Sequence, residues 1–159
     1  MKRTLMRRQV LKLVAGMALS PWPLHAASTQ TVRVQQTAAA LLAATEEGSL
    51  LQIDLEDLCH TLKLCGSSPV SFTVTDHDVD KVLGACRNAA ARMPSHKVKA
   101  AVLVCSGNGK NFRLTNCAEV FRVIRHAMNE STYLMFGVVS DSTLLDAMRV
   151  SWLAGAPDG

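Results

Sequence analysis

The chain has 159 residues, a formal net charge of +4 and a hydrophobic content of 48%. This size fits one domain that can bury a real core, and the apolar content is ordinary for a globular protein. Removal of residues 1–26, which hold five Lys or Arg and no Asp or Glu, leaves 12 basic and 13 acidic residues, a formal net charge of −1. This balance, with only 4% aromatic residues, argues against a nucleic-acid-binding function.

The first 27 residues have the features of an export signal. A positive start that includes Arg7 and Arg8 precedes a short apolar core at 11–19 and a small-residue region at 24–27. The sequence Arg-Arg-Gln-Val-Leu-Lys from Arg7 is similar to the twin-arginine motif, whose machinery exports folded proteins. The apolar core is shorter than the roughly 20 residues of a spanning helix, so no stable membrane span is expected. Export predicts a periplasmic or secreted protein. The alternative, a basic amphipathic start in a truncated gene, predicts a cytoplasmic one.

Hydrophobic periodicity predicts helices and strands from residue 29 onward. We expect helices at 29–45, 55–64, 79–93 and 116–128, and strands at 70–74, 99–105, 133–139 and 147–154. Gly66 should end the second helix, and Asn116 with Glu119 resembles a capping box for the fourth. The second strand is apolar enough to be buried on both faces, whereas the last is expected at an edge. The arrangement is α+β: a four-stranded mixed sheet with helices on one face, preceded by a long helix. The predicted division is a signal at 1–27, a leading helix at 28–48 and a domain at 49–159.

Two carboxylates three residues apart, Asp54 and Asp57, lie in the sequence Gln-Ile-Asp-Leu-Glu-Asp-Leu, after the first of these helices and at the start of the second. Acidic residues at a helix start accept hydrogen bonds from free backbone N–H groups and complement the helix dipole. Their spacing by itself therefore favours a helix cap.

The order of elements around this loop resembles the C-terminal half of FtsZ, the bacterial relative of tubulin, over residues 31–156. In that family the loop reads Asn-x-Asp-x-x-Asp, is called the synergy loop, and reaches into the nucleotide pocket of the neighbouring subunit. Asp54 and Asp57 stand at the two acidic positions of this motif. Gln52 replaces the usual Asn, and Glu56 adds a charge. The glycine-rich phosphate loop of the tubulin kind is missing from the sequence, and Gly107-Asn108-Gly109-Lys110 is expected to form a turn.

The resemblance implies a non-enzymatic interaction module without its own GTP site. Gln52, Asp54, Glu56 and Asp57 would bind a protein partner, either an FtsZ subunit or a second copy, and the module would cap or modulate assembly. No cofactor is expected. The alternative is an exported binding or structural protein on the same fold, with Arg7 and Arg8 read by the twin-arginine export machinery. A gene fragment without function also stays open.

Two further groups of residues have ordinary interpretations. The five cysteines lie mostly in apolar runs and are expected to act as small buried apolar residues. The acidic cluster Asp76-His77-Asp78-Val79-Asp80 precedes a predicted helix, so that Asp76 or Asp78 is expected to cap it. No metal site is predicted there, because further ligands at a recognised spacing are missing from the sequence.

Overall fold

The computed structural model describes residues 2–17, 27–67 and 69–157. The elements in chain order are α1 (Lys2–Met17), α2 (Ala27–Ala43), α3 (Leu55–Leu64), β1 (Val70–Asp76), α4 (Val79–Ala91), η1 (Ser95–Lys97), β2 (Ala100–Gly107), α5 (Leu114–Ala127), β3 (Tyr133–Ser140), η2 (Ser142–Leu144) and β4 (Met148–Gly155). Every helix and strand predicted from residue 29 onward is present, with bounds shifted by no more than a few residues.

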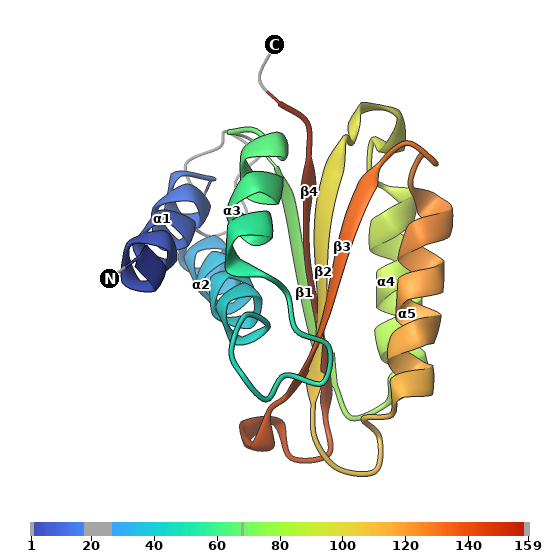
Figure 1. The fold of residues 1–159 in the computed structure, drawn as a ribbon. Helices are drawn as coiled ribbons and strands as arrows, with labels where there is room; N and C mark the ends of the chain where they lie inside the picture. The colour runs from blue at the N-terminus through green and yellow to red at the C-terminus, as the bar shows by residue number, and fades with distance from the viewer. Residues whose placement is uncertain (1, 18–26, 68, 158–159) are drawn as a thin grey trace.

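The four strands form one mixed sheet in the order β1-β4-β2-β3. β2 and β3 are parallel, whereas β4 runs antiparallel to both of its neighbours. Helices α4 and α5 cover one face of the sheet, α2 and α3 cover the other, and α1 lies outside α2 and α3 (Figure 1). The predicted α+β class and the mixed four-stranded sheet preceded by a long helix are confirmed. Helices cover the second face as well as the predicted one, because β2 is buried along its whole length and directs apolar side chains to both faces.

The last strand, β4, is central, so the prediction that it lies at an edge is wrong. It pairs with β1 on one side and with β2 on the other. Its polar residue Ser151 is fully buried, and the hydroxyl of Thr73 donates a 3.1 Å hydrogen bond to the Ser151 hydroxyl. Thr73 also shares a 3.0 Å hydroxyl hydrogen bond with Thr37 of α2. A buried polar side chain is tolerated in an interior strand when such bonds satisfy it.

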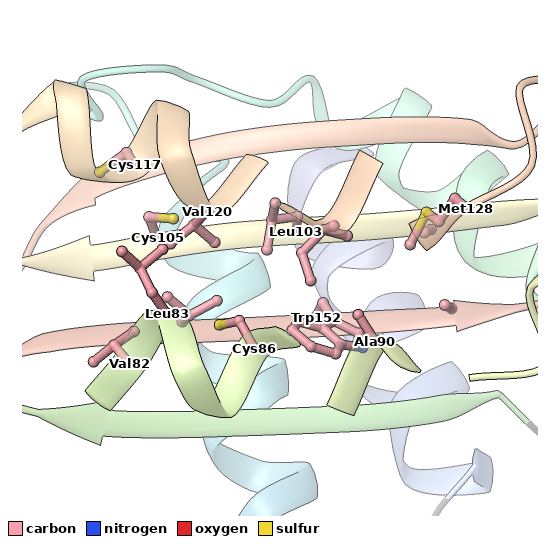
Figure 2. Packing of buried hydrophobic residues seen from close by; sticks show 14 of the residues in the cluster. Val82, Leu83, Cys86, Ala90, Leu103, Cys105, Cys117, Val120, Met128 and Trp152 are labelled. Carbon is pink, nitrogen blue, oxygen red and sulfur yellow. The ribbon is translucent and has the colours of Figure 1, made fainter. Parts of the chain in front are cut away.

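Two apolar clusters lie on opposite faces of the sheet. The α4–α5 cluster includes Trp152, Leu103 and Cys105, and Figure 2 shows their side chains between the sheet and the two helices. The α2–α3 cluster extends outward to Val10 and Val14 of α1. In the described ranges, no helix combines the length and apolarity that crossing a bilayer requires.

Local signals explain where two of the helices end or begin. Gly66 has a φ of +74°, and its N–H donates to the Lys63 carbonyl, so α3 ends there as predicted. Helix α5 begins two residues before the predicted start, because the Asn116 N–H donates to the Arg113 carbonyl at 3.0 Å. The Asn116 side chain donates instead to the carbonyl of Asn111 at 2.9 Å. The predicted capping box is therefore wrong, and Arg113 is the N-cap, without a side-chain bond.

Candidate functional site

The acidic loop, residues 44–57, runs from the end of α2 through the first turn of α3 and reaches the edge strand β3 (Figure 1). Leu51 exchanges two backbone hydrogen bonds with Val138 of β3, at 3.1 and 3.0 Å. Near the start of α3 the Ile53 N–H donates to the Ala44 carbonyl at 2.8 Å. Backbone bonds to a regular strand and to the preceding helix end hold the loop in one position.

Gly137 allows this close approach of the acidic loop to β3. A Cβ atom added there would lie 2.9 Å from both the Ala44 Cβ and the Ile53 Cδ1. Contacts this short do not occur between carbon atoms, so any larger residue at 137 would push the loop outward. The loop position thus depends on a glycine 80 or more residues further along the chain.

Asp54 is the N-cap of α3. Its Oδ1 accepts hydrogen bonds from the N–H groups of Glu56, at 2.7 Å, and Asp57, at 3.1 Å. Asp54 is in an extended conformation and is exposed, as is typical of an N-cap. The prediction of a helix cap is confirmed for Asp54, whereas Asp57 lies in the first turn of α3 with an exposed side chain.

A surface hollow of about 370 Å³ lies beside the acidic loop. Three of the four predicted binding residues, Gln52, Asp54 and Glu56, line it together with Glu47. The Gln52 side chain donates to the Thr45 carbonyl at 3.2 Å, which fixes it along the loop. Asp57 is not among the residues that line the hollow. Three carboxylates, those of Glu47, Asp54 and Glu56, therefore border the hollow.

The other wall of the hollow is formed by α1, through Arg3 and Met6. Arg3 donates to the Thr45 carbonyl at 2.9 Å and lies 3.9 Å from the Glu47 carboxylate. Arg7, one of the predicted signal residues, forms a hydrogen-bonded ion pair with Glu46. Arg8 is exposed.

Sequence reasoning missed Arg3, Glu46 and Glu47 as parts of this site. The sequence signal that could have found them is charge complementarity. The acidic pair Glu46-Glu47 follows a basic segment that contains Arg3 and Arg7. The predicted cleavage region lies outside the described residues, apart from Ala27, the first residue of α2.

The five thiols are all free and buried. Burial raises the pKa of Cys65 and of Cys86 to about 12, and it raises that of Cys59 as well. Cys105 and Cys117 share a hydrogen bond that raises the pKa of Cys105 and lowers that of Cys117. A buried thiol with a raised pKa stays protonated at neutral pH and packs as a small apolar group. The interpretation of most cysteines as core residues is confirmed.

The acidic cluster before α4 forms a cap, as predicted. Asp78 Oδ1 accepts from the N–H of Asp80 at 3.0 Å and weakly from that of Lys81. Asp76 Oδ1 accepts from the Asp78 N–H at 2.9 Å, and this bond lowers the pKa of Asp76. Gly107 is the last residue of β2, and the chain then forms a bend at Gly109 and a turn at Lys110, as expected.

No protein-family model matches this sequence, and no curated protein sequence matches it. Solved structures do match. An empty FtsZ dimer from M. jannaschii has a TM-score of 0.65 and 13% identity over 93% of this chain and 43% of that chain. A point mutant of that FtsZ has a TM-score of 0.67 and 14% identity, over 87% and 43%. A GTPγS-bound protofilament of CetZ2 from Haloferax volcanii has a TM-score of 0.52 and 13% identity, over 90% and 45%.

These similarities define the fold. The chain has the α+β fold of the FtsZ C-terminal domain. It spans less than half the length of each of these neighbours.

Proposed function

We propose that this chain is a non-enzymatic module that binds an FtsZ-type subunit through the acidic loop, residues 44–57. The observation that carries the proposal is the combination of a fixed loop backbone and exposed acidic residues. Leu51 and Ile53 anchor the loop by backbone hydrogen bonds, while Asp54 and Asp57 stay exposed. A preorganised loop loses little conformational entropy when it binds.

The similar structures support a partner of the same fold class. One of them is an FtsZ dimer and another is a CetZ2 protofilament, so these neighbours associate with copies of themselves. The partner of this chain would be an FtsZ-type subunit or a second copy. The sequence contains no glycine-rich phosphate loop. When this chain is bound at the end of a filament, it would therefore present no nucleotide face to the next subunit. Filament growth would stop at that end.

The test is the effect of the full chain on FtsZ assembly and GTP turnover. The double variant Glu56→Gln and Asp57→Asn should raise the concentration needed for half-inhibition by about tenfold, which corresponds to about 1.4 kcal/mol. Asp80→Asn is the matched control, because Asp80 is an exposed acid in the first turn of α4. Equal inhibition by the double variant and the unsubstituted chain would contradict the proposal.

A second pair of variants separates function from stability at Asp54. Asp54→Ala and Asp78→Ala each remove an N-cap with two backbone bonds, so each should lower the free energy of unfolding by about 1 kcal/mol. Only Asp54→Ala should also weaken the effect on FtsZ. If both variants weaken it equally, Asp54 acts through helix stability and not as a contact residue.

The N-terminal sequence supports a second candidate, an exported binding or structural module. Cells that express the full chain can be fractionated with and without Arg7→Lys and Arg8→Lys, which keep the charge. A shortened periplasmic product that depends on the arginine pair would favour this candidate. A product of unchanged size in the cytoplasm, with and without the substitutions, would contradict the exported module. Binding to an FtsZ-type subunit would then be the remaining candidate.

A further inference from the structure

Helix α1 packs on the outer surface of α3 and α2 and is separated from the sheet by them (Figure 1). Its apolar residues Met6, Val10, Leu13 and Val14 follow helical spacing and all belong to the α2–α3 cluster. Val10 is 0% and Val14 is 2% exposed. The other side of α1 carries Leu5 and Leu11, which are 59% and 48% exposed. One face of α1 therefore packs against α3 and α2, and the opposite face is exposed to solvent.

Two basic residues of α1, Arg3 and Arg7, meet the acidic loop at the N-terminal end of this contact. Arg7 pairs with Glu46, and Arg3 bonds to the Thr45 carbonyl and lies close to Glu47. Beside these residues, Arg3 also borders the hollow lined by Asp54 and Glu56. The contact thus combines an apolar stripe with complementary charge, and it covers part of the loop that the proposed function assigns to a partner.

We propose that α3 and the acidic loop form a binding site for a basic amphipathic helix, and that α1 occupies this site reversibly in the free chain. The helix it takes has apolar residues at positions i, i+4, i+7 and i+8 and arginines at i−3 and i+1, as α1 has relative to Met6. The inference deepens the proposed function, because α1 and a partner subunit compete for the acidic loop. When α1 is docked, Arg7 of the twin-arginine-like motif is also bound to Glu46 of the acidic loop.

Cys59 of α3 reports whether α1 is docked. Its Sγ lies 3.9 Å from the Met6 carbonyl, and the residue is 7% exposed. The other four cysteines are at most 1% exposed, within the clusters on either side of the sheet. Release of α1 should therefore uncover Cys59 and leave the other four thiols protected.

The experiment measures the rate at which an aromatic disulfide reagent modifies thiols in the native full-length chain. Val10→Asp with Val14→Asp should raise the rate at Cys59 at least tenfold, and Cys59→Ser in that background should remove the fast phase. The matched control is Leu5→Asp with Leu11→Asp, which adds the same charge to the exposed face of α1 and should change nothing. Equal rates in both double variants would overturn the proposal.

The ion pair is tested by exchanging its charges. Arg7→Glu should speed the modification of Cys59, and adding Glu46→Arg to the same chain should slow it again. A global loss of structure would expose all five thiols and would not be rescued in this way. Failure of Glu46→Arg to restore protection would contradict the assigned role of the pair.

A synthetic peptide of residues 2–17 tests the site in trans. Added to the full chain that carries Val10→Asp and Val14→Asp, it should protect Cys59 again in a saturable manner, and the same peptide with these two substitutions should not. A tethered helix has an effective concentration on the order of 1 mM, so absence of protection at about that concentration would overturn the proposal.

The competition is read separately in the FtsZ assay. The variant with released α1 should inhibit assembly at a lower concentration than the unsubstituted chain. If the thiol results hold and neither chain affects FtsZ, the helix site stands and the proposed function fails. If both chains inhibit FtsZ equally, the proposed function stands and competition is overturned.

Discussion

Replacement of Trp152 by alanine is expected to lower the free energy of unfolding by about 3–5 kcal/mol. Trp152 lies on the central strand β4, is 1% exposed and belongs to the α4–α5 cluster. Its ring stacks on Phe72 of β1, with ring centroids 4.3 Å apart, and lies beside Cys86 and Ala90 of α4 (Figure 2). Truncation would leave a large cavity between the sheet and α4, because the surrounding backbone is held by strands on both sides. Urea unfolding followed by circular dichroism measures the loss.

Trp152→Phe is the matched control for this prediction. The indole Nε1 is buried and has no hydrogen-bond partner among the described residues. An unpaired buried donor lowers stability by about 1–3 kcal/mol, and phenylalanine removes that donor while it keeps an aromatic ring. The loss should therefore stay below about 1.5 kcal/mol. If phenylalanine destabilises as strongly as alanine, the indole N–H contributes a hydrogen bond and the cavity is not the main cause.

Gly155→Ala is expected to destabilise the chain by about 1–3 kcal/mol or more, through overpacking. A Cβ at this position would lie 2.0 Å from the Cys65 carbonyl oxygen and 3.0 Å from the Cys65 carbonyl carbon. These are backbone atoms, so no change of rotamer can relieve the clash. Either the end of β4 or the C-terminus of α3 must move, and Gly155 also accepts a 2.8 Å hydrogen bond from the Lys99 N–H.

Gly84→Ala in α4 has the opposite expected sign. A Cβ there would meet nothing within 4 Å, and alanine is more stable than glycine in a helix by about 0.5–1 kcal/mol. The two glycine variants therefore carry the same chemical change with different surroundings. Equal stability changes in both would show that α3 does not pack against the end of β4 as described. The comparison uses urea midpoints at constant slope.

The acidic loop illustrates how one residue can satisfy two interpretations of a sequence. The sequence favoured Asp54 as a helix cap on spacing and as a contact residue by resemblance. The cap is present, with bonds to Glu56 and Asp57, and the residue is still exposed. A cap accepts backbone bonds on one side of the carboxylate and leaves the residue accessible, so the two roles are compatible. The loop variants, and not the geometry, decide the second role.

The sequence by itself determined the elements, because their signals are local. Asp54, Gly66 and Asp78 act on groups within a few residues, and hydrophobic periodicity predicted the helices α3, α4 and α5. The misplaced start of α5 shows the limit even here, since Asn116 bonds to the preceding loop and not to its own helix.

Only the tertiary structure decided which elements become neighbours. It placed β4 between β1 and β2, covered both faces of the sheet, and brought Arg7 to Glu46, 39 residues away in the chain. It also set α1 against α3 and α2, a contact that the sequence did not predict. The reason is that these contacts join residues far apart in the chain, and their free energy depends on shape and burial that no local pattern contains.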